Sequence, residues 1–185
     1  MPEPARADAE ERTPLRASAV LVPVYRDAGG ALRIVLVVRT HGGVHGGQIA
    51  FPGGKRDPDD ASLRATAIRE AGEEIGLAPE SIEIVDELPV IETRTTGYRI
   101  TPFLARIVRP PAWAMDTREV AEVLEPTVGD LLDPDAYGES VEQFPTRPSP
   151  QRIAFFRVGP HRLWGATYRI LHPLLARLAS GGWSI

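Results

Sequence analysis

The segment FPGGKRDPDDASLRATAIREAGEEIGL (residues 51–77) joins a glycine-rich turn to the clearest helical pattern in the chain. Apolar residues repeat there every four positions and define one helix face: Leu63, Ala67, Ala71 and Ile75. Asp60 or Ser62 can cap the start of this helix, and Gly76 suits a left-handed cap at its end. We therefore predict a helix that ends at Ile75.

The last turn of this helix carries three carboxylates, Glu70, Glu73 and Glu74, beside Arg69. Residues three and four apart share a helix face, so the three acids project together. Like charges at i and i+4 repel by about 0.2–0.5 kcal/mol, and each acid near a helix C-terminus opposes the helix dipole at about 0.3–1 kcal/mol. Arg69 can offset part of this by pairing with Glu73.

Two interpretations of the glutamates compete at this point. A solvated face with one ion pair is common, but it would not usually place its acids in the least favourable turn. A divalent cation reverses the electrostatic argument, because Mg²⁺ binds carboxylate and carbonyl oxygens and keeps waters and substrate phosphates as its other ligands. The crowding of acids favours a metal site.

The same residues resemble the Nudix box, G-x5-E-x7-R-E-U-x-E-E-x-G-U, where U is apolar. The matches to its second half are Arg69, Glu70, Glu73, Glu74, Gly76 and Leu77. The first half departs from the pattern. One extra residue lies between Gly54 and Arg69, Asp60 stands in place of the first glutamate, and Ala71 fills a position that is usually larger.

The extra residue, together with FPGG and the following D-x-x-D, resembles the coenzyme A pyrophosphatase branch of the Nudix hydrolase family. The segment VVRTHGGVHGGQIAFPGG (37–54) is similar to an accessory signature of that branch, and RLWGATYRIL (162–171) to its closing helix. The matches in the first segment are Arg39, Gly47, Gln48, Phe51, Pro52, Gly53 and Gly54. The resemblance covers most of residues 18–180.

This resemblance implies metal-dependent hydrolysis, with Mg²⁺ or Mn²⁺, of the pyrophosphate bond of coenzyme A or its derivatives. The products would be 3′,5′-ADP and 4′-phosphopantetheine or its acyl form. A diphosphate resists attack because its negative charge repels a nucleophile, and divalent cations neutralise that charge. Hydrolysis of ADP-ribose or of dinucleoside polyphosphates is the alternative within the family. A non-catalytic nucleotide- or coenzyme A-binding module is the alternative outside enzymes.

The resemblance also implies roles for individual residues. The catalytic residues would be Arg69, Glu70 and Glu73, with Arg69 holding Glu73 in position. The metal ligands would be Glu70, Glu73, Glu74 and the carbonyl of Gly54. The substrate-binding residues would be Arg39, Gln48 and Gly53. The general base stays open between Glu70 and four later glutamates: Glu119, Glu122, Glu139 and Glu142.

Other side chains carry weaker signals. Trp164 can stack on a base, although an aromatic residue on an apolar helix face more often packs in the core. The histidines His41 and His45 fit an ordinary loop better than a site for Mg²⁺, which prefers oxygen ligands. Cations or donors that can meet a 3′-phosphate lie near predicted loop or strand ends: Arg94, Tyr98, Arg147 and Arg152.

Strand patterns surround the helix and predict an α/β sandwich with a mixed β-sheet. The resemblance implies that this is a Nudix-like α/β/α sandwich. The expected strands are two within 18–40 around a glycine turn, then 82–91, 98–108, 119–126 and 152–158. A turn of helix is expected at TVGDLL, and a closing helix within 161–179. Residues 1–16 are expected to form a flexible tail, and 17–185 a single domain.

The composition of the 185 residues is that of an ordinary globular protein. A net charge of −4 with scattered basic residues argues against nucleic acid and anionic membranes as partners, and the chain has no cysteine for disulfides or thiolate chemistry. The N-terminus lacks the apolar core of a signal peptide. We expect a cytoplasmic monomer or homodimer that acts on a small molecule.

Overall fold

The computed structural model describes residues 14–40, 46–93, 96–144 and 147–185. The strands are β1 (Arg16–Arg26), β2 (Leu32–Ile34), β3 (Leu36–Arg39), β4 (Ile49–Ala50), β5 (Gly53–Lys55), β6 (Ile82–Glu87), β7 (Ile91–Thr93), β8 (Tyr98–Ile107), β9 (Val120–Leu124), β10 (Tyr137–Glu142), β11 (Gln151–Val158) and β12 (His161–Leu163). The helices are α1 (Leu63–Ile75), α2 (Val128–Leu132) and α3 (Gly165–Ala179), with 3₁₀ turns η1 (Pro79–Ser81) and η2 (Pro134–Ala136). Residues 1–13 of the expected tail lie outside the described residues, and β1 already includes Arg16.

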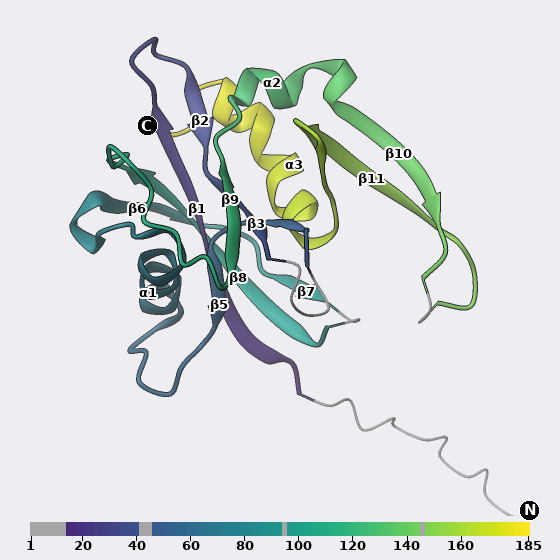
Figure 1. The fold of residues 1–185 in the computed structure, drawn as a ribbon, viewed down its shortest axis with the longest axis horizontal. Coiled ribbons are helices and arrows are strands. Elements are labelled where there is room, and N and C mark those ends of the chain that lie inside the picture. The colour runs from purple at the N-terminus through teal and green to yellow at the C-terminus, as the bar shows by residue number, and fades with distance from the viewer. Residues whose placement is uncertain (1–13, 41–45, 94–95, 145–146) are drawn as a thin grey trace, which may run out of the picture.

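The central sheet is mixed, as the sequence predicts (Figure 1). Its order is β2-β1-β8-β6, with β5 also paired to β1 and β7 to β8. Strands β1 and β8 run parallel, from Arg16 opposite Tyr98 to Val24 opposite Arg106, whereas the other pairs in this sheet are antiparallel. A second sheet has the order β4-β3-β9.

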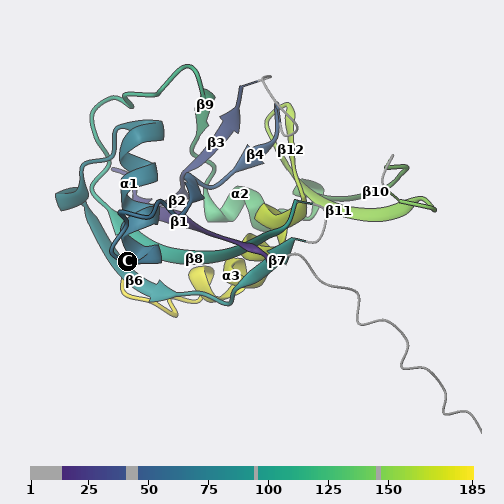
Figure 2. The ribbon, with the colours of Figure 1, turned by 90° about the horizontal axis from the view of Figure 1, so that it is seen from below.

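Alternation along β1 separates two apolar cores. Ala19 and Leu21 pack in the cluster that contains the buried face of α1, whereas Val22 and Val24 pack in the cluster that contains α2 and α3. Successive side chains of a strand point to opposite faces of the sheet, so a single strand supplies both layers. Figure 2 shows α1 and α3 on opposite sides of β8, which confirms the α/β/α sandwich.

The third sheet has the order β10-β11-β12, and its strands β10 and β11 project from the body as an arm (Figures 1 and 2). Strand β10 was not expected. Its residues alternate between exposed and half-buried, and it carries few apolar side chains, so it gives no strong strand pattern. As a consequence, Glu139 and Glu142 lie on a strand of the arm rather than in a loop.

The strand expected over 82–91 is two separate strands, β6 and β7. Pro89 lies between them, and proline has no N–H to donate to a ladder, which accounts for the interruption. The turn of helix expected at TVGDLL is α2, which begins with a capping box in which Thr127 and Asp130 exchange hydrogen bonds.

Candidate active site

Helix α1 begins and ends much as its sequence predicts. The Ser62 side chain accepts a hydrogen bond of 3.1 Å from the Ala65 N–H, and Gly76 closes the helix with φ of 68°. Asp60, the other candidate cap, has a different role. It accepts hydrogen bonds from the Thr66 hydroxyl at 2.8 Å and from Arg69, so it fastens the loop before α1 to the middle of the helix.

Arg69 is the centre of a dense ion-pair network. Its guanidinium donates to both oxygens of Asp60 at 2.9 and 3.0 Å and to Glu73 at 2.9 Å. It also lies 3.0 Å from Glu70 and donates to the Lys55 carbonyl at 3.2 Å. The hydrogen bonds that Asp60 accepts, above all those from Arg69, hold the pKa of its carboxyl well below its usual range. Asp60, at the position of the first glutamate of the box, thus supports Arg69.

Glu74 is the buried member of the glutamate cluster, with only 2% of the residue exposed. Its carboxylate accepts the Gly53 N–H at 3.0 Å and lies 3.4 Å from the Arg39 guanidinium. Burial raises its pKa to about 7 despite these two contacts. Arg39 also lies 3.9 Å from Glu119, so it stands between one acid of α1 and one that precedes β9.

Glu70 lies against the backbone of β5. A Cβ on Gly54 would come within 2.4 Å of the Glu70 carboxylate, so only glycine leaves room for this approach. Burial raises the pKa of Glu70, although Arg69 acts in the opposite direction. The glycine pair of FPGG serves both glutamates, because the Gly53 N–H binds Glu74 and Gly54 makes space for Glu70.

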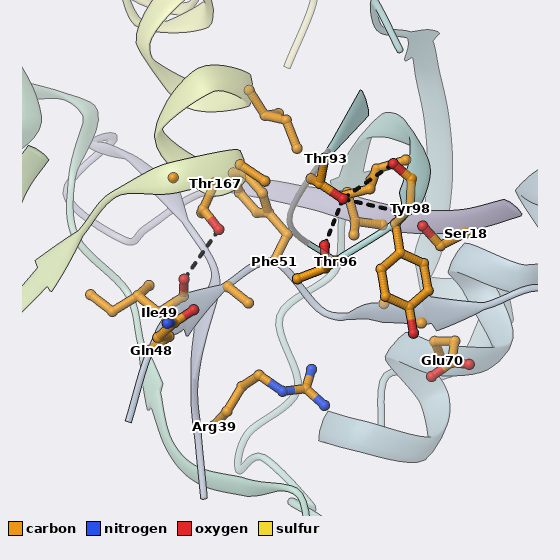
Figure 3. A pocket seen from close by; sticks show the side chains of 18 of the residues that line it. Ser18, Arg39, Gln48, Ile49, Phe51, Glu70, Thr93, Thr96, Tyr98 and Thr167 are labelled. Carbon is orange, nitrogen blue, oxygen red and sulfur yellow. Dashed lines mark hydrogen bonds between the residues drawn. The ribbon is translucent and has the colours of Figure 1, made fainter. Parts of the chain in front are cut away.

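The glutamates of α1 line a cleft of about 610 Å³, and Figure 3 shows Glu70 in it. Its charged lining consists of Arg39, Lys55, Glu70, Glu73, Glu74 and Glu119. Its apolar lining consists of Val20, Ile49, Ala50, Phe51, Ile100, Trp164, Ala166 and Ile170. Hydroxyl groups from β7, β8 and their connection also line the cleft, and Thr93 and Thr96 share a hydrogen bond of 2.6 Å. The cleft therefore combines charged, hydroxyl and apolar groups in its lining.

The structure places every expected metal or substrate residue in this cleft. Arg39, Gln48, Gly53 and Gly54 line it together with the three glutamates of α1. These residues come from β3, the following connection, β5 and α1, and the two glycines allow β5 and α1 to come within contact distance. Whether each performs the role that the sequence suggests stays a prediction.

The candidate general bases separate into two groups. Glu119 lines the cleft, as Glu70 does. Of the other three, Glu122 pairs with His161 at 3.1 Å, and the remaining two pair on the arm, Glu139 with Arg152 and Glu142 with Arg162. None of these three is among the described residues that line the cleft.

The weaker candidates also separate. Tyr98 lines the cleft beneath the Arg16 guanidinium, which lies 4.3 Å from its ring centre. Trp164 lines the cleft too, where its ring stacks on Phe144 with centroids 5.7 Å apart, so it is not the core residue that the helix pattern favoured. Arg152 is occupied by Glu139 on the arm. The candidates Arg94, His41 and His45 lie outside the described residues.

Sequence reasoning did not identify Lys55, Thr93 or Thr96 as cleft residues. Lys55 directly follows FPGG, and this adjacency was a usable signal. The two threonines have no such signal in the sequence. Their position in the cleft depends on contact between the start of β1 and the connection from β7 to β8. Asp60 was noticed only as a helix cap or as a departure from a motif.

The fit of a divalent cation depends on the donor set. The cleft offers hard oxygen ligands, and burial disfavours the charged form of two of its carboxylates, which a cation would offset. Within the described residues, no three acidic or histidine side chains already converge as a complete cage. Glu73 faces Arg69, and Glu74 faces Gly53 and Arg39. The donor chemistry therefore fits a hard divalent cation, which would replace some of these contacts.

Comparison with known proteins identifies the class. Residues 15–145, more than half of the chain, match the NUDIX domain family. The chain is also 34% identical over 164 residues to a protein of Salmonella paratyphi B called Uncharacterized Nudix hydrolase NudL, covering 88% of this chain and 83% of that one. The protein of Salmonella newport with the same name matches equally. The chain belongs to the Nudix hydrolase family, whose members act on small nucleoside diphosphate derivatives and generally use Mg²⁺ or Mn²⁺.

Solved structures agree on the fold. A MutT/nudix family protein from Enterococcus faecalis gives a TM-score of 0.60 at 18% identity, covering 95% of this chain and 66% of that one. A C. elegans Ap4A hydrolase binary complex gives 0.52 at 21%, covering 63% and 82%. The NUDIX domain of Shewanella oneidensis NrtR complexed with ADP ribose gives 0.51 at 20%, covering 68% and 80%. None of the helices in the described ranges is long and apolar enough to cross a membrane.

Proposed function

We propose that this chain hydrolyses the pyrophosphate bond of coenzyme A or its derivatives, releasing 3′,5′-ADP and 4′-phosphopantetheine or its acyl form. The observation that carries the proposal is the mixed lining of the cleft. It combines carboxylates, Arg39 and Lys55 with buried and half-buried apolar side chains. Such a cleft suits a diphosphate joined to a long, largely uncharged arm.

The apolar part of the lining favours this substrate over the alternatives. Val20, Ile100 and Trp164 are half-buried, so part of each remains accessible from the cleft. Burying apolar substrate surface is favourable by roughly 25 cal/mol per Å². The pantetheine arm can use that surface, whereas the terminal ribose of ADP-ribose and the second nucleoside of a dinucleoside polyphosphate are more polar.

The side chains of α1 divide the work. Glu70 and Glu74, with the Gly54 carbonyl, would hold the principal cation, and Glu73 would hold a second one. When bound, Mg²⁺ or Mn²⁺ neutralises the diphosphate and lowers the pKa of the attacking water. Arg69 fixes Glu73 through the contact at 2.9 Å. Arg39 would bind a substrate phosphate, and Gln48 and Gly53, which line the same cleft, would also bind substrate.

The proton of the attacking water needs an acceptor in reach of the cleft. Glu70 and Glu119 are the two candidates from the sequence that line it, and they approach from different elements. Glu119→Gln decides between them. If Glu119 is the base, its loss lowers kcat and removes the acidic limb of the pH–rate profile, on which activity rises as the base loses its proton, while Mn²⁺ affinity is kept. If Glu70 is the base, Glu119→Gln retains most of the activity.

A substrate panel tests the proposal. Coenzyme A, acetyl-coenzyme A, oxidised coenzyme A, ADP-ribose and diadenosine polyphosphates should be compared with Mg²⁺ and with Mn²⁺. We expect the highest kcat/KM for a coenzyme A species, with 3′,5′-ADP as a product. ADP-ribose turned over as well as coenzyme A would overturn the branch assignment. Tight binding of a nucleotide without turnover of any compound would instead indicate a binding module.

A further inference from the structure

We propose that Arg39 is a displaceable counter-ion of Glu74, which a divalent cation releases toward the diphosphate of the substrate. This inference rests on the proposed function for its last step only, because exchange at Glu74 concerns the protein and the cation alone. In this view Arg39 couples the two binding events, since the cation that takes its place on Glu74 also frees it for a phosphate.

The first argument is the looseness of the contacts that Arg39 makes. Its guanidinium lies 3.4 Å from Glu74 and 3.9 Å from Glu119, with one nitrogen directed to each. Both distances exceed the usual 2.7–2.9 Å or so of a charge-assisted hydrogen bond. Arg69, on the same cluster, meets Asp60 through two bonds of 2.9 and 3.0 Å. Arg39 therefore neutralises its partners without being fixed by them.

The second argument is the burial of Glu74. Only 3% of its side chain is exposed, whereas 34% of the Arg39 side chain is exposed. A buried carboxylate needs a cation or a proton, because an uncompensated buried charge is costly. Arg39 supplies the positive charge when no metal ion is bound. Its long side chain reaches Glu74 from the end of β3 and has free volume in the cleft into which it can turn.

The third argument is electrostatic exclusion. A divalent cation on Glu74 would stand close to the guanidinium, and like charges at such a distance repel in a partly buried site. Arg39 therefore leaves Glu74 as the cation arrives. A diphosphate in the cleft gives it a new partner, for which a planar guanidinium is well suited. Linkage then requires that cation and substrate each strengthen the binding of the other.

The test is the affinity for Mn²⁺ alone, measured by calorimetry or by the EPR signal of free Mn²⁺, with no nucleotide present. Arg39→Gln should bind Mn²⁺ about three- to tenfold more tightly than the unmodified chain, because the competing cation is gone. Arg39→Lys should stay near the unmodified value. Arg64→Gln is the matched control, since Arg64 is an exposed arginine of α1 and its loss changes the net charge equally.

Mn²⁺ affinity that is unchanged or weaker in Arg39→Gln would overturn the proposal, and a purely substrate-binding arginine predicts that result. If Arg39→Gln does not fold, an NMR experiment on the unmodified chain tests the exchange instead. The arginine Nε–H signals should be followed by NMR during Mg²⁺ titration, with assignment through Arg39→Lys. We expect the Arg39 signal to move and the Arg69 signal to stay, and a stationary Arg39 signal would refute the exchange.

The effect of Arg39 on the substrate is measured in a separate experiment. KM for coenzyme A should rise in Arg39→Gln while Mn²⁺ binds more tightly, a pair of opposite changes that a structural role would not produce. If no coenzyme A species is a substrate, the proposed function fails, yet the Mn²⁺ measurement still stands. If coenzyme A is a substrate and Mn²⁺ affinity does not change, the exchange alone fails.

Discussion

Two arginines hold the glutamates of α1 from opposite sides, and they do so in different ways. Arg69 belongs to the helix and makes four hydrogen bonds of 2.9–3.2 Å with Asp60, Glu73 and the backbone of β5. Arg39 comes from β3, across the cleft, and makes only long contacts with its acids. One side of the cluster is built as fixed structure and the other as an exchangeable contact.

The difference shows which parts of the site serve geometry and which serve binding. A fixed side keeps the last turn of α1 in one position against FPGG, which a cluster of like charges would otherwise resist. An exchangeable side leaves the buried carboxylate able to accept a cation. Fixed partners of this kind orient the groups that bind a metal ion, which is the role of outer-shell hydrogen bonds at metal sites.

The largest effect should come from the glutamates that both sides hold. Glu70→Gln and Glu74→Gln should each lower kcat by more than about a hundredfold, because loss of outer-shell partners alone costs about 10–100-fold. The fold should survive, since glutamine keeps the size of each side chain. Steady-state rates with Mg²⁺, with circular dichroism as the check on folding, measure this. Glu80→Gln, at an exposed position in η1, is the control. Near-normal rates would contradict the assignment of both residues to metal binding.

The comparison itself is tested by matched changes of the two arginines. Arg69→Gln should lower the free energy of unfolding by about 2 kcal/mol, because nearly buried Asp60 loses two charge-assisted hydrogen bonds. We expect a smaller loss for Arg39→Gln, whose contacts are long and partly screened by solvent. Urea unfolding in EDTA measures both. Equal losses would show that the two sides do not differ in rigidity.

Much of the fixed side could be predicted from sequence. The period of four in the apolar residues, the serine cap and the glycine stop define α1, and i to i+4 spacing gives the pair of Arg69 with Glu73. These features are local, so short-range rules suffice. The glycine pair before the helix also indicated close backbone approach, although not that Gly54 would make room for Glu70 in particular.

The exchangeable side could not be predicted in the same way. The contact of Arg39 with Glu74 joins residues 35 positions apart, and it depends on β3 lying across the cleft from α1. The placement of Glu119 and Trp164 in the cleft, and the removal of Glu139 and Glu142 to the arm, follow from sheet topology. Topology of this kind has no local signal in β10, whose residues are mostly polar.

A third test addresses the glycine on which Glu70 rests. Gly54→Ala places a Cβ 2.4 Å from the Glu70 carboxylate, which must swing away. Because a flexible side-chain end moves rather than backbone, we expect nearly full stability with activity lowered about tenfold. Gly72→Ala is the matched control within α1. It should raise stability by about 0.5–1 kcal/mol through helix propensity and leave kcat unchanged. A Gly54→Ala enzyme of full activity would show that Glu70 has no fixed position against β5.

The smallest effect concerns the charge of Glu74 on the exchangeable side. Its folded-state pKa is raised to about 7, above the value of an unfolded glutamate, so the folded chain binds this proton more tightly. In EDTA this group should therefore lower stability as pH rises from about 5 to 8, by on the order of 1 kcal/mol. Glu74→Gln removes the titrating group, and its Oε1 can still accept the Gly53 N–H. The melting temperature of Glu74→Gln should exceed that of the unmodified chain at pH 8, with the difference shrinking toward pH 5 and in excess Mg²⁺. A lower melting temperature of Glu74→Gln at pH 8 would mean that the ion pair with Arg39 stabilises the chain outright, and the exchangeable side would then be as structural as the fixed one.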